Sequence, residues 1–352
     1  MDYEERYMRR CLDLAVLGAG SVSPNPMVGA VVVYDRRVIG EGFTSPYGGP
    51  HAEVNAVNAV LEKYGESESR KLFKLSTIYV SLEPCSHQGK TPPCADMLID
   101  YGFQKVVIGC LDPFISVNGR GLEKLHLAGI ETKVGVLGKQ CEFINRRFFT
   151  HIKQQRPFVI LKWAETADGY FAPLHNSQHW ISNAASKQLS HKWRSEEDSI
   201  LIGTSTALND NPSLTTREWK GKNPRRILID KDLKVPASAA VLDRSAETIV
   251  FNAIESDWRT NIKRIALENF EFYLPQTILY QLYLMDIQSI IIEGGIQTLQ
   301  SFIDVDLWDE ARVFVSQQHW GEGRKSPSFQ GGNVMKYKVG NDMLRLYYNE
   351  RY

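Results

Sequence analysis

The chain has 352 residues, of which 43% are hydrophobic, and its 41 Lys and Arg residues balance 41 Asp and Glu residues. This length predicts two domains of ordinary size, and a formal net charge of zero argues against a strongly basic nucleic-acid-binding protein. The absence of any run of 18 apolar residues excludes a membrane-spanning helix, and the start MDYEERYMRR is unlike a secretory signal peptide. Five cysteines, an odd number, do not suit a disulfide framework in a chain of this size. We therefore expect a soluble, reduced, cytoplasmic enzyme or binding protein.

The first half of the chain alternates short strands with helices, which indicates a layered α/β domain. The hydrophobic patterns predict helices at 4–18, 51–64, 95–101 and 122–128, and strands at 30–34, 38–42, 75–82, 105–110 and 131–135. The segment RRFFTHIKQQRP at 146–157 is basic, polar and ends in proline, so it is the best candidate for a linker.

The same alternation restarts beyond this candidate linker. The patterns predict a helix at 184–194 and strands at 158–163, 199–203, 226–230, 248–251, 289–292, 312–316 and 342–348. The sequence contains no internal repeat and no low-complexity segment. We therefore expect two α/β domains, at 1–150 and 155–352.

A set of potential metal ligands lies in the first half. His51 and Glu53 open the helix expected at 51–64, and Cys85 and Cys94 flank the loop SHQGKTPP. One imidazole and two thiolates suit a tetrahedral Zn²⁺ ion whose fourth position is open to water. Glu53 can reach that water without binding the metal, as a proton shuttle must. A nearby helix N-terminus would favour the thiolate form of Cys85.

Two structural alternatives compete with a catalytic zinc site. A single Cys or His is most often a buried thiol or a helix cap, but here four residue types coincide in order. A closed structural site needs a fourth protein ligand. His87 is the available candidate, and its position one residue beyond Ser86 makes it a weak one. The pattern therefore favours the open, catalytic site.

The order H-x-E, then P-C, then a further Cys is the signature of zinc-dependent nucleobase deaminases. Most of them separate the cysteines by two residues, whereas eight separate Cys85 from Cys94. This longer form, EPCSHQGKTPPC, together with SPNPMVGAVVV and GGPHAEVNA, resembles the deaminase half of the bifunctional deaminase/reductases of riboflavin biosynthesis. The resemblance implies a cytidine-deaminase-like three-layer domain. It also implies zinc-hydroxide hydrolytic deamination of 2,5-diamino-6-(5-phosphoribosylamino)pyrimidin-4(3H)-one with loss of ammonia.

The resemblance assigns roles position by position. It matches the zinc ligands with His51, Cys85 and Cys94, the proton-transferring glutamate with Glu53, a pyrimidine-contacting asparagine with Asn25, and the loop that faces the substrate with Lys90 and Thr91. Two positions depart from the family pattern, because Thr44 stands where a histidine is common and Gly49 where a glutamate is frequent. A threonine carries no charge, so we expect that substrate contact to be altered.

The second half lacks the usual nucleotide-binding motifs. No G-x-G-x-x-G follows a strand and no G-x-x-x-x-G-K-[ST] is present, which argues against a Rossmann or P-loop site. Glycine-containing turns instead follow expected strands in LKWAETADGYFA (161–172), SILIGTSTALNDNPSLTTR (199–217) and IIIEGGIQTLQSFI (290–303). Glycines at strand ends let backbone N–H groups approach a phosphate, although each such turn alone is more often a plain connection.

The order and spacing of these segments resemble the reductase half of the same family, over about residues 158 to 310. The resemblance implies a dihydrofolate-reductase-like α/β domain. It would reduce the ribosyl group of 5-amino-6-(5-phosphoribosylamino)uracil to ribityl with NADPH. By position it assigns the cofactor to Ala164, Trp180, Thr206, Asp210, Gly294 and Gly295, and the phosphoribosyl substrate to Arg194, Leu214, Arg217 and Glu293.

Other assignments in the second half stay open. Lys162 and Asp168 are candidate substrate-site groups, and the sequence does not decide between proton donation and positioning. The register of NSQHWIS leaves either Ser177 or Gln178 at the family's substrate-binding serine position. Lys231, just past ILID, is the candidate cation for the 2′-phosphate of NADPH, and the choice of NADPH over NADH is otherwise inherited from the resemblance.

Two other functions compete with the bifunctional enzyme. A nucleoside or tRNA deaminase with an unrelated appended domain predicts C-x-x-C and, for tRNA, a basic surface. A catalytically decayed, zinc-stabilised ligand-binding module predicts loss of Glu53 or a fourth ligand. The sequence favours the enzyme. We expect Zn²⁺ and NADPH as cofactors and a phosphoribosylaminopyrimidine as the small-molecule substrate. We also expect no nucleic-acid or membrane partner, and a homo-oligomer.

Overall fold

The computed structural model describes residues 3–86, 92–114, 119–174, 181–258, 261–329 and 334–349. The chain divides into two compact units, Met1–Gln155 and Arg156–Tyr352, and each has its own sheet and core. Within the described ranges, no helix is long and apolar enough to cross a membrane.

The first unit is a five-stranded sheet with the strand order β2-β1-β3-β4-β5. Strand β1 is antiparallel to β2 and β3, whereas β3, β4 and β5 run parallel. The strands are β1 (Gly29–Tyr34), β2 (Arg37–Phe43), β3 (Thr77–Leu82), β4 (Lys105–Cys110) and β5 (Glu131–Val134).

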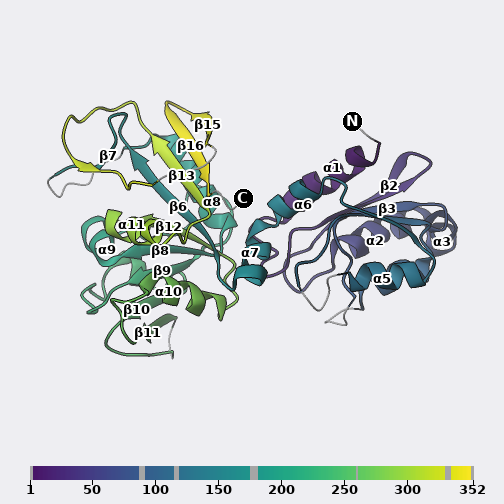
Figure 1. The fold of residues 1–352 in the computed structure, drawn as a ribbon, viewed down its shortest axis with the longest axis horizontal. Helices are drawn as coiled ribbons and strands as arrows, with labels where there is room; N and C mark the ends of the chain where they lie inside the picture. The colour runs from purple at the N-terminus through teal and green to yellow at the C-terminus, as the bar shows by residue number, and fades with distance from the viewer. Residues whose placement is uncertain are drawn as a thin grey trace. The chain divides into compact units, whose positions relative to one another are not determined.

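Helices cover both faces of this sheet, which gives three layers (Figure 1). They are α1 (Tyr3–Ala15), followed by a 3-10 turn at Val16–Gly18, α2 (Ala52–Tyr64), α3 (Glu66–Phe73), α4 (Cys94–Tyr101), α5 (Arg120–Leu127), α6 (Gly138–Ile144) and α7 (Arg146–Gln154). In Figure 1, α1 and α6 lie on one face of the sheet, and α2 and α5 on the other. Because both faces are covered, β1 reads as the nearly continuous apolar run GAVVVY rather than as an alternating one.

The candidate linker at 146–157 is ordered. Most of it forms α7, which buries Phe149 and Thr150, and the boundary between the two units falls directly after this helix. The polar and basic side chains of the segment are divided between two environments, because Lys153 and Gln154 are exposed whereas His151 and Arg156 are buried.

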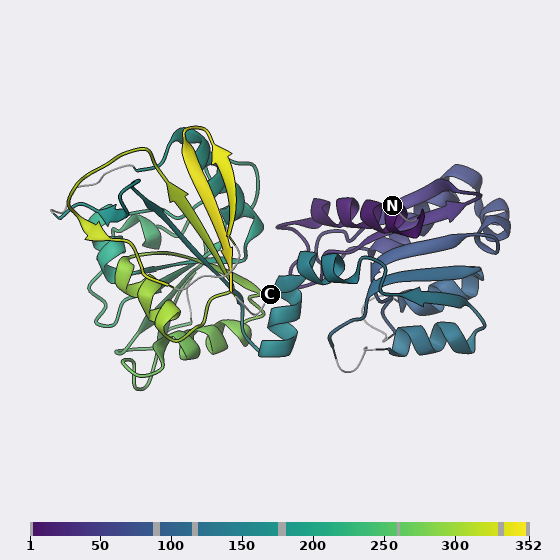
Figure 2. The same cartoon turned by 45° about the horizontal axis from the view of Figure 1, so that its top comes forward.

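The second unit is built on a nine-stranded sheet with the order β11-β10-β9-β8-β12-β6-β13-β16-β15. The first seven strands in that order are parallel, and β16 and β15 are antiparallel additions at one edge, yellow in Figure 2. The strands are β6 (Phe158–Glu165), β8 (Ser199–Gly203), β9 (Arg225–Ile229), β10 (Thr248–Asn252), β11 (Ile262–Ala266), β12 (Ser289–Gly294), β13 (Glu310–Val315), β15 (Val334–Val339) and β16 (Asp342–Tyr348). A separate two-stranded sheet pairs β7 (Tyr170–Ala172) with β14 (Arg324–Lys325).

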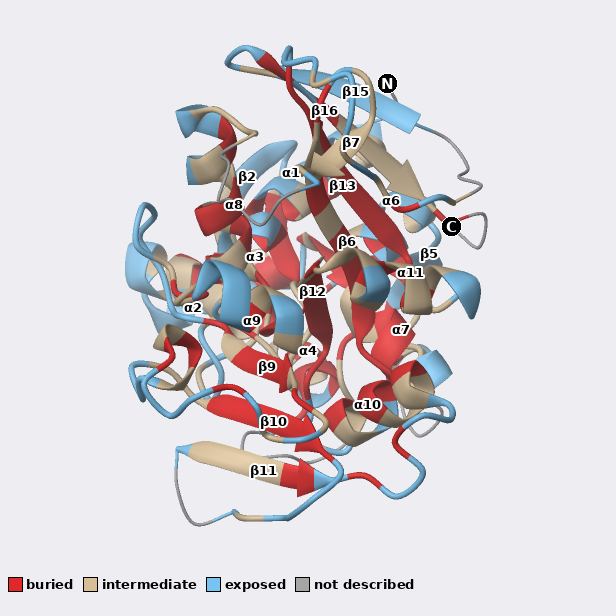
Figure 3. Ribbon diagram, turned by 90° about the vertical axis from the view of Figure 1, so that its left-hand side faces the viewer, coloured by how far each residue is buried: buried red, intermediate tan, exposed pale blue. Residues whose placement is uncertain are grey.

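Two cores lie on opposite faces of the large sheet, and alternate residues of β6 contribute to each. Val159 and Leu161 pack with side chains of α10 and α11, whereas Phe158 and Ile160 pack with Trp193 of α8. The helices are α8 (Ala184–Glu196), α9 (Thr204–Asp210), α10 (Leu274–Tyr283) and α11 (Ile296–Asp304), with a 3-10 turn at Ala240–Leu242. Figure 3 shows that the central strands of this sheet are buried (red), whereas the edge strand β11 is mostly of intermediate exposure (tan).

A crevice is expected at the carboxyl ends of the neighbouring strands β8 and β12. The chain leaves β8 into α9, which packs in one core through Ala207, and leaves β12 into α11, which packs in the other core through Leu299. Departure to opposite faces makes this point a topological switch, where α/β sheets bind ligands.

The close approach of β2 to α2 yields the first prediction. A Cβ atom on Gly42 would lie 2.4 Å from the backbone nitrogen of Ala56 and 2.5 Å from the carbonyl oxygen of Ala52. Gly42→Ala should therefore destabilise the first unit by about 3 kcal/mol, the upper range for overpacking. Calorimetry of the intact chain should show the transition of the first unit at lower temperature and that of the second unit unchanged.

Gly129→Ala is the matched control, because no atom lies within 4 Å of its added Cβ and only the positive φ of +77° is unfavourable. It should cost about 1 kcal/mol. Equal effects of the two substitutions would contradict the steric argument.

Candidate active sites

Three potential metal ligands meet at the ends of three elements of the first unit. His51 is the residue before α2, Cys85 follows β3, and Cys94 is the first residue of α4. Their ligand atoms all lie within 4.8 Å of one another. The Sγ atoms of Cys85 and Cys94 lie 3.6 and 3.4 Å from Nδ1 of His51.

These distances fit a tetrahedral zinc ion. With Zn–S near 2.3 Å and Zn–N near 2.0 Å, tetrahedral geometry places sulfur and nitrogen about 3.5 Å apart. Three ligands of this type leave a fourth position open, as in catalytic zinc sites. Within the described ranges, this is the one group of three or more His, Cys, Asp or Glu side chains close enough to hold a metal ion.

The surroundings of the sulfurs favour a thiolate. The Cys94 side chain and His51 lower the pKa of Cys85 to about 4 despite its burial, and the backbone N–H of Cys94 donates to Cys85 Sγ at 3.3 Å. The adjacent Cys85 and burial raise the pKa of Cys94. A bound dication would hold both sulfurs as thiolates.

Glu53 is a buried carboxylic acid beside this group. It lies in the first turn of α2, and its residue is 4% exposed. Burial and the nearby Cys85 raise the pKa of Glu53 to about 7. A bound dication would act in the opposite sense, because positive charge favours the carboxylate.

Glu83 is a site residue that the sequence analysis missed. Its buried carboxylate accepts hydrogen bonds from the backbone N–H groups of Asp112, Gly119, Gly121 and Leu122 at 3.0–3.3 Å. These bonds tie the start of α5 to the segment that carries Cys85. The sequence could have indicated this role, because Glu83 directly precedes Pro84 and Cys85 at the end of a buried strand. A charged residue in such a position needs hydrogen-bond partners.

The expected substrate-contact residues of the first unit fall in three places. Asn25 is half-buried in a loop that is joined to the segment before His51, because the N–H of Tyr47 donates to the carbonyl of Ser21. Thr44 is 3% exposed, and its hydroxyl accepts from the N–H of Val28 at 3.2 Å, so it holds this loop instead of offering a charge. Lys90 and Thr91 lie outside the described residues.

In the second unit, eight of the predicted residues line one cavity of about 310 Å³ at the carboxyl ends of β6 and β12. Lys162, Arg194 and Glu293 form a buried charged cluster within it. Arg194 donates to Glu293 at 2.8 Å, and Nζ of Lys162 lies 3.8 Å from the same carboxylate. The other predicted residues that line it for the substrate or the cofactor are Ala164, Thr206, Asp210, Leu214 and Arg217.

The charged groups of this cluster shift one another's pKa values. Burial opposes ionisation of Glu293, but Arg194 and Lys162 outweigh it and hold the pKa of Glu293 at about 2. Burial lowers the pKa of Lys162, and Glu293 opposes that effect. Lys162 is therefore an ammonium group that loses its proton more readily than an exposed lysine.

A second cavity of about 790 Å³ opens where the topological switch predicts a ligand site. It is lined by residues at the starts of α9 and α11, including Gly203, Thr206 and Gly295. Thr206 and Asp210 line both cavities, so the two adjoin. A Cβ on Gly203 would lie 2.6 Å from the Thr298 hydroxyl, and Gly294 has φ +131°, so both positions require glycine.

Three predicted residues lie outside the lining of both cavities: Asp168, Lys231 and Gly294, which directly precedes the lining residue Gly295. The Asp168 carboxylate accepts from the N–H groups of Trp320 and Gly321 at 3.0 and 2.8 Å, which fixes the turn after β6. Lys231 pairs with Glu271. Trp180, Ser177 and Gln178 lie outside the described residues.

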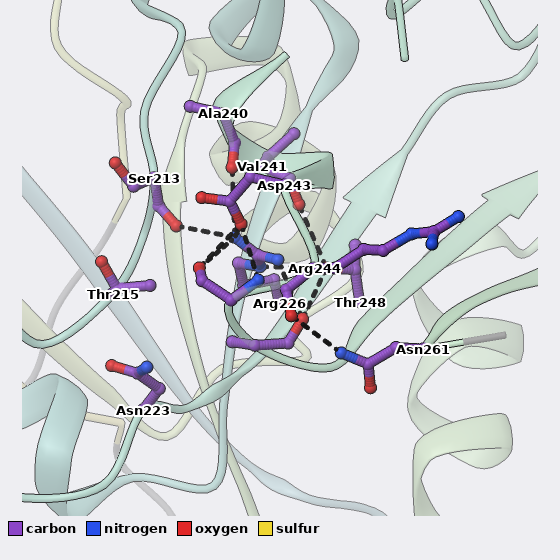
Figure 4. A network of polar contacts seen from close by, with 12 residues as sticks. Ser213, Thr215, Asn223, Arg226, Ala240, Val241, Asp243, Arg244, Thr248 and Asn261 are labelled. Atoms are coloured by element: carbon purple, nitrogen blue, oxygen red, sulfur yellow. Dashed lines mark hydrogen bonds and ion pairs between the residues drawn. The ribbon is translucent and has the colours of Figure 1, made fainter. Parts of the chain in front are cut away.

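The loop that carries Leu214 and Arg217 is held by Arg226 of β9, a fully buried residue (Figure 4). Its guanidinium donates to the carbonyl of Ser213 at 3.3 Å and to the Asp243 carboxylate at 2.8 Å. It also donates to the carbonyl oxygens of Ala240 and Ala246 and to the Thr248 hydroxyl.

His191, in the smaller cavity, is a second site residue that the sequence analysis missed. It lies three residues before Arg194 on α8, and both line the smaller cavity. The spacing of Lys187, His191 and Arg194 places them on one helix face, which was the available signal.

The two units together define a zinc-dependent deaminase joined to a reductase that uses a nicotinamide cofactor. Residues 1–110 match the cytidine and deoxycytidylate deaminase zinc-binding region, and residues 157–347 match the RibD C-terminal domain. The riboflavin biosynthesis protein RibD of Aquifex aeolicus is 39% identical, over 92% of this chain and 89% of that protein. RibD of Escherichia coli is 32% identical, over 90% and 89%.

A solved structure from Thermotoga maritima, described as a diaminohydroxyphosphoribosylaminopyrimidine deaminase/5-amino-6-(5-phosphoribosylamino)uracil reductase, has a TM-score of 0.87 and 36% identity. The alignment covers 99% of each chain. The chain belongs to the RibD family of bifunctional deaminase and reductase enzymes of riboflavin biosynthesis. The predicted fold class and the bifunctional enzyme are confirmed, and the alternative of an unrelated appended domain is excluded.

The metal geometry yields the second prediction. The purified chain should contain about one zinc ion, and Cys94→Ala should lose it on dialysis because two remaining ligands bind weakly. Elemental analysis of the dialysed protein is the measurement. Cys110→Ala removes a buried thiol that lies outside the ligand group and should keep the metal. Full zinc content in Cys94→Ala would refute the assignment.

Proposed function

We propose that the first unit hydrolytically deaminates 2,5-diamino-6-(5-phosphoribosylamino)pyrimidin-4(3H)-one. The second unit would then reduce the ribosyl group of 5-amino-6-(5-phosphoribosylamino)uracil to ribityl. The activities named for the Thermotoga maritima protein support these substrates. The observation that carries the proposal is the tetrahedral spacing of His51, Cys85 and Cys94 in a chain that also contains the Lys162–Glu293–Arg194 cavity.

In the first unit, His51, Cys85 and Cys94 would hold Zn²⁺, which supplies Lewis acidity toward a water molecule and the substrate. Glu53 would take the proton from the attacking water and give it to the departing amino group, so that ammonia leaves. Its buried position in the first turn of α2, next to the ligand group, suits both steps, because a general acid–base group must lie within reach of the atoms that exchange the proton. Asn25 would contact the pyrimidine ring, and Lys90 and Thr91 would face the substrate.

In the second unit, a nicotinamide cofactor would supply the hydride, and Lys162 the proton that completes the reduction. Burial lowers the pKa of this ammonium group and so favours its release of a proton. Glu293 would hold Lys162 and Arg194 in place through its ionised carboxylate. Arg194, Leu214 and Arg217 would bind the phosphoribosyl group.

We assign the nicotinamide nucleotide to Ala164, Thr206, Asp210, Gly294 and Gly295. Its proposed binding site is the larger cavity, which Thr206, Asp210 and Gly295 line, and Ala164 lines the adjoining smaller cavity. NADPH is the proposed cofactor. Arg324 on β14 lines the larger cavity and supports this choice, because a guanidinium suits a 2′-phosphate. Lys231, the cation suggested by sequence, pairs with Glu271 outside that lining.

The remaining proposals concern compartment and assembly. All five cysteines are free thiols, which supports a reducing, cytoplasmic compartment. The edge strand β15 exposes Met335 and Tyr337, which supports a homo-oligomer, because an uncovered sheet edge favours pairing with another chain.

The role of Glu53 gives the third prediction. Glu53→Gln should lower the deamination rate by about 10²- to 10⁴-fold, the usual contribution of a general acid–base group. Zinc content and reduction of the already deaminated substrate should be retained, as measured by elemental analysis and by loss of NADPH absorbance. Glu62→Gln, an exposed change on the same helix, is the control. Loss of zinc from Glu53→Gln would instead make Glu53 a metal-site residue.

Lys162 gives the fourth prediction. Lys162→Met keeps the length of the side chain without its ionisable proton, and should lower the reduction rate by about 10²- to 10⁴-fold. Cofactor affinity and deamination should stay within about twofold, because the change lies in the proton-transfer group alone. Lys234→Met, an exposed position outside both cavity linings, is the control. A Lys162→Met enzyme that reduces substrate at the parent rate would exclude this role.

A further inference from the structure

His191 lies at the wall of the smaller cavity of the second unit, among positively charged side chains. Its residue is 2% exposed, and it lines the cavity together with Arg194 and Arg217. A histidine in this position has two alternative roles. It is either a third cation of an anion-binding site or a neutral group with a directed hydrogen bond.

One hydrogen bond shows whether His191 is cationic or neutral. The backbone N–H of Arg217 donates to Nδ1 of His191 at 3.1 Å. A nitrogen that accepts a hydrogen bond carries no proton, so the ring is the neutral tautomer with its proton on Nε2. Protonation of Nδ1 would break this bond and place a third positive charge beside two guanidinium groups.

The other ring nitrogen is available to a ligand in the cavity. Nε2 makes no hydrogen bond with any described residue, and the imidazole lines the cavity. Its N–H is therefore a donor whose partner must come from the ligand.

The positively charged side chains around His191 indicate the chemical class of that ligand. Glu293 neutralises Arg194, and Glu218 pairs with Lys187 at the same cavity. Arg217 donates to the Thr215 hydroxyl at 2.9 Å and has no carboxylate partner among the described residues. One uncompensated guanidinium and a neutral N–H donor together suit an oxyanion with several acceptor atoms, such as a phosphate monoester.

We propose that His191 is a specificity-determining residue of the reductase. Its neutral imidazole donates Nε2–H to the phosphate of the substrate, and its Nδ1 fixes the backbone of Arg217 so that the guanidinium binds the same group. This inference rests on the proposed reductase function of the second unit.

The charged groups around His191 agree with a neutral ring. They are Lys187 and Arg194 on its own helix, Arg217 and Glu218 on the loop that follows α9, and Glu293 at the end of β12. Burial and the two arginines lower the pKa of His191 to about 4. His191 therefore contributes a hydrogen bond, not a charge, throughout the neutral range.

Three substitutions separate the two hydrogen bonds. His191→Asn keeps an acceptor near the position of Nδ1 but loses the donor in the cavity. His191→Gln places a donor near the position of Nε2 but loses the acceptor for Arg217. His191→Phe keeps the ring and loses both. Lys192→Gln is the control on the same helix, since Lys192 pairs with Glu196 and lies outside both cavity linings.

The Asn and Gln variants should each raise the KM for the deaminated substrate about tenfold and leave kcat within about twofold, because each loses one hydrogen bond to the bound phosphate or its anchor. The Phe variant should raise KM about a hundredfold if the two losses add. The thermal transition of the second unit, measured by calorimetry of the same samples, reports on the folding of the unit that carries His191. A lower kcat at unchanged KM, or an Asn variant with the parent KM, would overturn the proposal.

Binding of ribose 5-phosphate, followed by ³¹P NMR, tests the inference without turnover. This measurement tests the role of His191 even if the second unit does not catalyse the proposed reduction. The ratio of parent to His191→Asn affinity should be constant between about pH 6.5 and 8.5, because a neutral donor does not titrate there. A ratio that rises as the pH falls would show a cationic His191 and overturn the proposal. Long-range ¹H–¹⁵N spectra, assigned with the Asn variant, should show the Nε2–H tautomer, whereas Nδ1–H would refute it.

Discussion

In each of the two sites, a buried carboxylate that accepts hydrogen bonds from backbone N–H groups holds the surrounding segments in place. Backbone groups at strand and helix ends cannot reach water when they are buried, so each needs a partner. Glu83 accepts four such bonds beside the metal ligands. Asp342 of β16 accepts from the N–H of Asn183, the residue that caps α8, and α8 in turn carries His191 and Arg194. The side chains that carry the chemistry are therefore positioned by acids that take no part in it.

The distribution of charge matters more here than its sum. The formal net charge is zero, yet four cations line the smaller cavity of the second unit against the two carboxylates of Asp210 and Glu293; the cations are Lys162, Lys187, Arg194 and Arg217. Glu293 stays ionised because Lys162 and Arg194 outweigh the cost of its burial. The cavity thus combines an internal ion cluster with one uncompensated arginine, which is how a neutral protein presents a local site for an anion.

Sequence patterns predicted the parts of the molecule that depend on local information. Strand β6 begins with the apolar run FVIL, and β8 has the apolar run ILI. The spacing of His51, Cys85 and Cys94 predicted a zinc ligand set, and the match to a deaminase zinc-binding region agrees with it. Asp168 stands beside a glycine turn that looks catalytic, but its partners, Trp320 and Gly321, lie about 150 residues further along the chain. The roles of Glu83 and His191 likewise depend on backbone groups of distant loops, which no local pattern reports.

Strand β6 has a consequence for how this chain can change over time. Its successive side chains belong to two different cores, and Lys162 and Ala164 continue the row begun by Phe158 and Ile160. Loss or gain of a single residue within β6 would exchange the two rows, so that each core received the side chains fitted to the other. The same slip would turn Lys162 away from Glu293. Sequence drift in this strand is therefore confined to substitutions, while insertions and deletions must accumulate in the loops that join the strands.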